Sequence, residues 1–221
     1  MIPSTGFQVF PKMGRMFRDM VITEKLDGTN AQILIVPSKD CPYDPCNPPV
    51  HCEDQMDPKA VNLYAGSRSR WLQPGKSTDN YGFAQWVKDN AEELKKLGLG
   101  RHFGEWWGAG IQRRYGKTEK IFSLFNSGRW HPNAFGGVSE EIDGVWKPGP
   151  KCCRVVPVLY RGEFSTQKVL EVCYDLRLKG SLAAPGFMDA EGIITYHEAS
   201  KTSFKTTLKD DEKAKSAVTT N

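Results

Sequence analysis

Lys25 lies in the heptapeptide EKLDGTN, residues 24–30, where a lysine comes shortly before a turn signal. A lysine amine can attack phosphorus only after it has lost its proton, and nearby cations and partial burial favour that loss. Asp27-Gly28 indicates a tight turn, and glycine lets the backbone approach a ligand closely. A surface hairpin with a solvated lysine fits the same residues, so the heptapeptide alone leaves both interpretations open.

Two later segments carry groups that suit a nucleotide. Residues 66–70, GSRSR, contain Arg68 and Arg70, and a guanidinium fork binds phosphate or ribose oxygens in a fixed geometry. Residues 103–108, FGEWWG, place Glu105 between a glycine and two tryptophans, where its oxygens can accept from ribose hydroxyls. Taken alone, the arginines are typical of a solvated loop, and at least one tryptophan is expected in the core.

Three more segments add aromatic, acidic and basic side chains. Residues 121–126, IFSLFN, contain Phe122 and Phe125, which can stack on a base or belong to the core. Glu191 begins an apolar run at 191–194, and a carboxylate that faces a triphosphate requires a hard cation between them. Residues 203–209, SFKTTLK, carry Lys205 and Lys209.

The order and spacing of these six segments over residues 24–209 resemble the motifs of the covalent nucleotidyltransferase superfamily, which contains DNA ligases, RNA ligases and mRNA capping enzymes. KLDG is similar to the KxDG nucleophile motif. EKLDGTN is similar to the EKxxGTN signature of ATP-dependent, nick-sealing RNA ligases of the phage and RNA-editing type. Asp27 departs from that signature, because many of those ligases have histidine there and aspartate is typical of DNA ligases and capping enzymes.

The resemblance implies a role for each matching residue. Lys25 would be the nucleophile, Lys205 would contact the α-phosphate, and Glu191 would be catalytic through a divalent metal. The residues implied in nucleotide binding are Glu24, Asn30, Arg68, Arg70, Glu105, Phe125 and Lys209.

Two of these assignments have alternatives. Arg70 takes the place of Arg68 if the register lies two residues later, and Phe122 is the fallback for Phe125. The family often has a second lysine where this chain has Thr207, and Lys209 is then the candidate replacement.

The implied reaction uses ATP and either Mg²⁺ or Mn²⁺. Lys25 would carry AMP covalently and pass it to a 5′-phosphate, after which a 3′-hydroxyl attacks and releases AMP. RNA or DNA ends, nicked or single-stranded, are the implied substrates; an ATP-dependent DNA ligase and a non-catalytic nucleic-acid-binding domain remain the alternatives. Residues 113–117 and 129–131, which join cations to aromatic rings, are candidate strand-binding segments.

Apolar alternation and turn signals predict the elements that position these residues. Strands are expected at 20–23, 31–36, 61–65, 102–108, 121–125, 155–160, 192–196 and 203–208, the last two as a hairpin. Helices are expected at 81–97, capped by Asp79 or Asn80, and at 165–178, while residues 127–151 are expected to be irregular. Long antiparallel strands with few helices predict an α+β fold, and the resemblance implies an ATP-grasp-like nucleotidyltransferase (ligase adenylation) domain with flanking helices.

Composition favours a globular intracellular protein. The 221 residues are 39% hydrophobic and 25% charged, with no apolar run that could span a membrane and no apolar secretory segment at the start. We expect a cytoplasmic monomer, either cellular or virus-encoded, and its net charge of +4 permits a polyanionic partner.

We expect one catalytic domain at residues 1–209, with a Cys/Pro-rich insertion at 41–58 and a charged tail at 210–221. Because two-domain ligases continue well past the last motif, the chain resembles the catalytic domain alone, and a separate substrate-binding partner remains open. Cys41, Cys46 and Cys52, with His51, could hold zinc, but their spacing matches no common finger, so incidental thiols are favoured.

Overall fold

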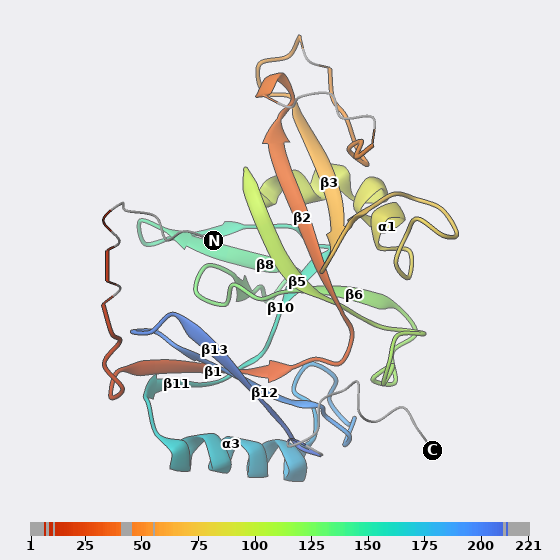
Figure 1. The fold of residues 1–221 in the computed structure, drawn as a ribbon. Helices are drawn as coiled ribbons and strands as arrows, with labels where there is room; N and C mark the ends of the chain where they lie inside the picture. Colours follow the sequence, from red (N-terminus) through yellow and green to blue (C-terminus); the bar gives the residue numbers. More distant parts are fainter. Residues whose placement is uncertain are drawn as a thin grey trace, which may run out of the picture.

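Two β-sheets form the main layers of the protein, and a small third sheet lies beside them (Figure 1). The computed structural model describes residues 7, 9–10, 12–40, 46–54, 56–209 and 211. The four-stranded sheet is antiparallel, in the order β11 (Val158–Glu163), β1 (Asp19–Lys25), β12 (Gly192–His197) and β13 (Thr202–Thr207). The six-stranded sheet has the order β10 (Cys153–Val155), β6 (Lys120–Leu124), β5 (Gly100–Gly108), β2 (Thr29–Pro37), β3 (Val61–Ser67) and β4 (Trp71–Leu72), and β10 runs parallel to β6.

Helix α3 (Thr166–Lys179) lies along the outer face of the four-stranded sheet (Figure 1). The Ser165 hydroxyl accepts a hydrogen bond from the Lys168 amide and so caps its first turn. Cys173 and Leu176 are buried in a core shared with the sheet. This helix was expected at residues 165–178, and the structure confirms it to within one residue at either end.

Strand β1 has two different faces. Met20 and Ile22 are fully buried in the core beneath α3. Because successive side chains of a strand point to opposite faces, Val21, Thr23 and Lys25 project toward the six-stranded sheet, where all three line a cavity. The residues on one face of β1 therefore anchor the strand in the core, and those on the other face are available to contact a ligand.

The six-stranded sheet is covered by α1 (Phe83–Asp89), which is followed by α2 (Ala91–Leu94) and by a 3₁₀ turn, Lys95–Leu97. One continuous helix over 81–97 was expected, and that expectation is wrong at Asn90. Its φ of −109° and ψ of 17° leave the helical region, and its side-chain amide donates to the Trp86 carbonyl oxygen at 2.8 Å. Asparagine competes for backbone groups in this way, which breaks the helix between two apolar stretches.

Asp79 acts as the predicted cap, although α1 begins four residues after it, at Phe83. Its carboxylate accepts from the amides of Asn80, Ala84 and Gln85 at 2.6–3.1 Å. The amides of Ala84 and Gln85 belong to the first helical turn and have no partner inside it, so the aspartate satisfies them.

Residues 127–151 were expected to be irregular, but they form the third sheet, with β7 (His131–Pro132), β8 (Val138–Ile142) and β9 (Val145–Pro148). Strands β8 and β9 are joined by Asp143-Gly144, both at positive φ (52° and 77°), with Ile142 opposite Val145. Asp-Gly is a favoured two-residue hairpin turn. Asp143-Gly144 was therefore a sequence signal for a hairpin, which the glycine- and proline-rich composition of the segment obscured.

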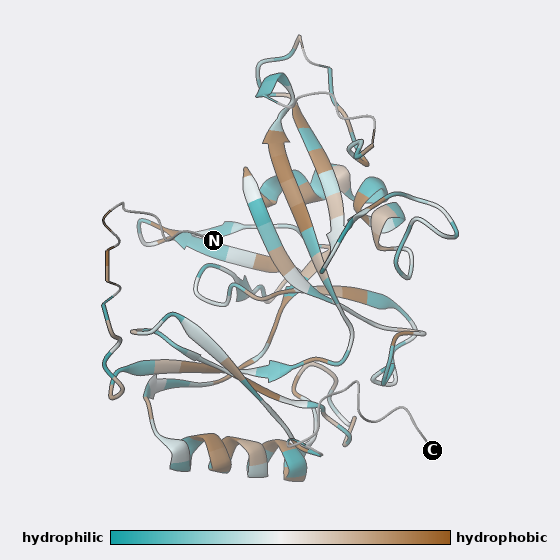
Figure 2. Ribbon diagram, viewed as in Figure 1, coloured by the Kyte–Doolittle hydropathy of each residue, from teal (hydrophilic) through white to brown (hydrophobic). Residues whose placement is uncertain are grey.

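A third apolar cluster joins the two main layers: Leu26, Trp107, Tyr115, Val156 and Ala184 are all buried in it. Figure 2 shows hydrophobic residues along β2 and in parts of β1 and α3. The structure confirms the α+β class with mainly antiparallel sheets and few helices. Within the described part of the chain, no helix has the length and apolar character to cross a membrane. Of the expected insertion and tail, residues 41–45, 55, 210 and 212–221 lie outside the described residues.

Candidate active site

Lys25 is the last residue of β1, and it forms an ion pair with Glu191, the residue that immediately precedes β12. The Lys25 Nζ atom lies 2.6 Å from Glu191 Oε2. The two strands are antiparallel neighbours, with Lys25 opposite Gly192, so the pairing register brings these side chains together. Glu191 is only 2% exposed, whereas the lysine reaches into the cavity.

The segment after Lys25 crosses from one sheet to the other, because β1 belongs to the four-stranded sheet and β2 to the six-stranded sheet. The surface-hairpin interpretation is therefore wrong. Gly28 is required here by packing, since a Cβ at this position would overlap the Trp106 carbonyl oxygen. Gly28 thus lets the crossing segment approach β5 closely.

Glu105, on β5, is hydrogen-bonded to this crossing segment. Its Oε1 accepts from the Gly28 amide at 3.1 Å, and its Oε2 accepts from the Asn30 side-chain amide at 3.0 Å. Burial, which leaves the residue 7% exposed, raises the pKa of Glu105 to about 7, although the Lys25 charge and the two hydrogen bonds oppose that shift. A carboxyl group with such a pKa changes its charge near neutral pH.

A cavity of about 920 Å³ lies between the two main sheets and collects most of these groups. Lys25, Asn30, Glu105 and Phe125 are among its lining residues. Phe125 follows the end of β6 and is 42% exposed, whereas Phe122 is fully buried against α1. Of the two candidate stacking residues, only Phe125 faces the cavity.

Lys205 lies on β13 opposite Ile194 of β12. Cross-strand partners share a face of the sheet, and Ile194, Tyr196 and Ser203 on that face line the cavity. Lys205 therefore projects to the cavity side. Lys209 does not line the cavity; its Nζ lies 2.6 Å from a carboxylate oxygen of Asp189.

Glu24 borders the cavity, but its carboxylate is turned to the α3 side of β1 and is 1% exposed. It accepts from the Ser181 hydroxyl at 2.5 Å and from the amides of Leu182 and Ala183 at 2.8 and 2.9 Å. Burial raises the pKa of Glu24, and these hydrogen bonds partly offset the shift. The side chain therefore ties the end of β1 to the loop after α3.

Arg68 and Arg70 follow β3 and are not among the residues that line the cavity. Arg70 donates to the carbonyl oxygens of Thr78 and Asp79 at 2.8 and 3.4 Å, so it organises its own loop. Arg68 is exposed. The structure thus brings Lys25, Asn30, Glu105 and Phe125 to the cavity wall, with Glu191 paired to Lys25 and Lys205 on the cavity side of β13. It leaves Arg68, Arg70 and Lys209 outside the cavity lining.

In the two predicted strand-binding segments, 113–117 and 129–131, several side chains make contacts within the protein itself. Arg113 forms ion pairs with Asp27 and Asp189, and Tyr115 is 2% exposed. Trp130 is 1% exposed, with the Arg129 guanidinium 4.4 Å from its ring centroid, so it cannot stack on a base. Sequence reasoning missed the internal role of Arg113, because its two partners are 86 and 76 positions away and no local pattern indicates them.

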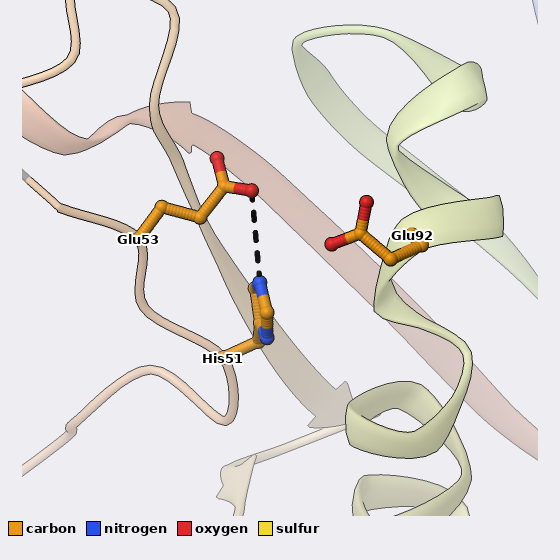
Figure 3. A group of neighbouring side chains, drawn as sticks. All are labelled: His51, Glu53 and Glu92. Carbon is orange, nitrogen blue, oxygen red and sulfur yellow. Dashed lines mark ion pairs between the residues drawn. The ribbon is translucent and has the colours of Figure 1, made fainter.

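A second polar cluster lies outside the cavity, where the insertion before β3 meets α2. Figure 3 shows His51 and Glu53 facing Glu92, with ligand atoms that all lie within 4.8 Å of one another. The Lys95 ammonium lies 2.5 Å from Glu53 and 2.7 Å from Glu92, and its hydrogen bond is the main reason that the pKa of Glu53 is lowered. The cluster thus ties the insertion to the helix. Cys46 and Cys52 are exposed, and Cys41 lies outside the described residues.

Several solved structures of Naegleria gruberi RNA ligase are similar in fold to this chain: an apo form, a form with ATP and Mn, and a form with pyrophosphate. Each is 16% identical in sequence, with a TM-score of 0.48, and the matches cover 86%, 85% and 86% of this chain. The chain spans about half of their length, at 49%, 48% and 49%. No curated protein matches the chain.

The sequence model of the family described as RNA ligase matches residues 18–209. That range contains both main sheets, α3 and every residue that lines the cavity. It also begins just before β1 and ends just after β13, so the matched region coincides with the layers that build the site. The chain therefore belongs to the RNA ligase family.

Proposed function

We propose that this chain is an ATP-dependent RNA ligase that joins 5′-phosphate and 3′-hydroxyl ends through a lysyl-AMP intermediate on Lys25. The observation that carries the proposal is that Lys25, the buried carboxyl group of Glu105 and the exposed ring of Phe125 line one cavity. The buried carboxylate of Glu191 lies 2.6 Å from the Lys25 Nζ atom. Family membership supports the same reaction.

In the first step, the Nζ lone pair of Lys25 forms a bond to the α-phosphorus of ATP. The bond from that phosphorus to the bridging oxygen breaks, and pyrophosphate leaves with the electron pair. Because Lys25 is ion-paired with Glu191, its nitrogen must leave the pair and lose a proton before it can attack. Lys205, on the cavity side of β13, is placed to contact phosphate oxygens.

The Glu191 carboxylate fits a hard divalent cation. It is 2% exposed, and carboxylate oxygens suit Mg²⁺ or Mn²⁺. The cation would offset the charge of the triphosphate. Glu191 already faces a positive charge, the Lys25 ammonium, which indicates an environment suited to a cation.

Two further transfers complete the reaction. A 5′-phosphate oxygen attacks the phosphorus of lysyl-AMP, the bond to Nζ breaks, and Lys25 recovers a proton. A 3′-hydroxyl then attacks the activated 5′-phosphate, and AMP leaves. Catalysis of these steps depends mainly on positioning and on charge stabilisation.

The proposal is tested with ATP or GTP labelled at the α-phosphate, incubated with the purified chain and resolved on a denaturing gel. We expect a labelled band with ATP, little label with GTP, and none with Lys25→Ala. Lys147→Ala, which removes an exposed lysine of β9 that is not among the cavity-lining residues, is the matched control and should label normally. A labelled band that persists in Lys25→Ala would exclude Lys25 as the nucleophile.

The nature of the substrate is tested separately, with nicked and single-stranded RNA and DNA carrying the required ends. Asp27 is typical of DNA ligases, but in this chain its carboxylate pairs with the Arg113 guanidinium at 3.0 Å, which gives the aspartate a structural role of its own. We therefore expect RNA joining to exceed DNA joining. Absence of both the labelled band and all joining would favour a non-catalytic nucleic-acid-binding domain.

A further inference from the structure

Arg113 bridges the two chain segments that carry Lys25 and Glu191. Its Nε lies 3.0 Å from Asp27 Oδ2, and its Nη1 lies 2.7 Å from Asp189 Oδ2 and 3.0 Å from the Asp189 carbonyl oxygen. Asp27 comes two residues after Lys25, and Asp189 comes two residues before Glu191. One guanidinium therefore holds both flanks of the ion pair.

The two flanks leave the four-stranded sheet at the same end. Lys25 and Gly192 are register partners at the end of the β1–β12 pairing, and beyond them the two segments are no longer paired. Arg113 comes from neither strand but from the loop between β5 and β6 in the other sheet. It therefore joins three parts of the chain where the strand hydrogen bonds stop.

The loop that presents Arg113 is conformationally specified. Gln112, Arg114 and Tyr115 have φ values of 43°, 60° and 50°. Non-glycine residues in this region cost about 1–3 kcal/mol each and persist only where the surroundings determine them. Tyr115 supplies such surroundings, because it is buried among Leu26 and Trp107 and its hydroxyl accepts from the Asp27 amide at 2.9 Å.

We propose that Arg113 is a positioning residue, which fixes Lys25 relative to Glu191 for the attack on the α-phosphate. The inference rests on the proposed function. Asp189 keeps a second cation, Lys209, at 2.6 Å, so removal of Arg113 leaves that carboxylate paired but ends its link to Asp27. The planar guanidinium reaches two carboxylates at once, which a lysine ammonium in its place does not reproduce.

The test is the rate of lysyl-AMP formation at saturating ATP, the KM for ATP, and the rate at which a pre-adenylylated nick is sealed. Arg113→Gln should slow lysyl-AMP formation by about 100-fold, the size expected for misplacement of a reacting group by about 1 Å. The KM for ATP and the sealing rate should stay close to wild type, because Lys25 is not the nucleophile in sealing. Arg154→Gln is the matched control and should leave all three values unchanged, because Arg154 is an exposed arginine of β10 that does not line the cavity and donates to the carbonyl oxygens of Lys151 and Cys153.

Two more variants separate positioning from folding. Arg113→Lys should recover only part of the lost rate. Arg113→Gln combined with Asp27→Asn should be no slower than Arg113→Gln alone, because both changes break the same link.

Equal losses in all three values would mean a general structural role and would overturn the inference, as would an unchanged rate of lysyl-AMP formation in Arg113→Gln. If Arg113→Gln does not fold, Arg113→Lys decides by the same criteria. A wild-type chain that forms no lysyl-AMP would instead overturn the proposed function itself.

Discussion

The Nζ atom of Lys25 lies 2.6 Å from Oε2 of Glu191, so the proposed nucleophile is paired with the carboxylate proposed to hold the metal. A lysine in such a pair is an ammonium, which has no lone pair for attack on phosphorus. The contact therefore describes a resting arrangement from which Lys25 must be released. It also makes the two residues interdependent, since neither can be changed without altering the charge that the other faces.

Glu191→Gln should slow lysyl-AMP formation by about 100-fold or more, the size typical for loss of one electrostatic group in an active site. The amide keeps the shape of the side chain but removes the negative charge that faces Lys25. The rate is measured with labelled ATP over a range of Mg²⁺ and Mn²⁺ concentrations. Glu198→Gln serves as the control, because Glu198 lines the cavity but pairs with Arg161 and not with Lys25. An equal loss in both variants would contradict the assignment.

Phe125→Leu should raise the KM for ATP with little loss of stability, because the ring is 42% exposed in the cavity. Loss of stacking on a base is worth roughly 1–3 kcal/mol, or about 5- to 150-fold in affinity. Phe122→Leu is the matched substitution in the core, and it should lower the free energy of unfolding by about 1–3 kcal/mol with the KM unchanged. Steady-state kinetics and denaturant titration distinguish the two, and exchanged phenotypes would show that the nucleotide lies elsewhere.

Adenosine binding should strengthen by about fivefold between pH 6 and pH 8, because an ionised carboxylate accepts a ribose hydrogen bond about 1 kcal/mol better than a neutral carboxyl group. The cause is Glu105, whose pKa is raised to about 7 by burial, so it ionises as the pH rises through that value. Adenosine carries no phosphate, which keeps Lys25 and Lys205 out of the comparison. Calorimetry of wild type and Glu105→Gln checks this, and a pH dependence that survives in Glu105→Gln must arise from another group.

The same carboxyl group should affect stability in the opposite direction. A carboxyl group whose pKa is raised in the folded state favours folding most below its unfolded value of 4.5, and that contribution is lost as the pH rises toward about 7. Glu105→Gln should therefore flatten the decline in the free energy of unfolding across this window. Urea denaturation at several pH values measures it, and parallel curves for wild type and Glu105→Gln would contradict the raised pKa.

Lys205→Ala should reduce lysyl-AMP formation strongly, by about 10- to 100-fold as expected for loss of one phosphate contact, whereas Lys209→Ala should reduce it little. The reason is their placement, since Lys205 projects to the cavity side of β13 and Lys209 pairs with Asp189 outside it. The labelled-ATP assay compares them directly. A larger effect of Lys209→Ala would mean that Lys209, not Lys205, serves the triphosphate.

The sequence by itself determined the features that depend on neighbouring residues. Alternating apolar residues marked β1, β2 and β12, Asp79 marked the start of α1, and the amphipathic pattern over residues 165–178 marked α3. The order of the motifs also singled out Lys25, Glu105 and Glu191 before any contact between them was known. These signals are local, because side-chain periodicity and turn chemistry act over a few residues.

Only the tertiary structure decided which of these groups meet. The same residues 24–30 are compatible with a hairpin or with a crossing between sheets, and the packing of Gly28 against β5 selects the crossing. Register places Lys25 beside Glu191, and the loop after β5 delivers Arg113 to both flanks of that pair. Tertiary packing likewise buries Trp130 in the core. A side chain's partners are set by strand pairing and layer packing across long stretches of chain, and no local pattern encodes them.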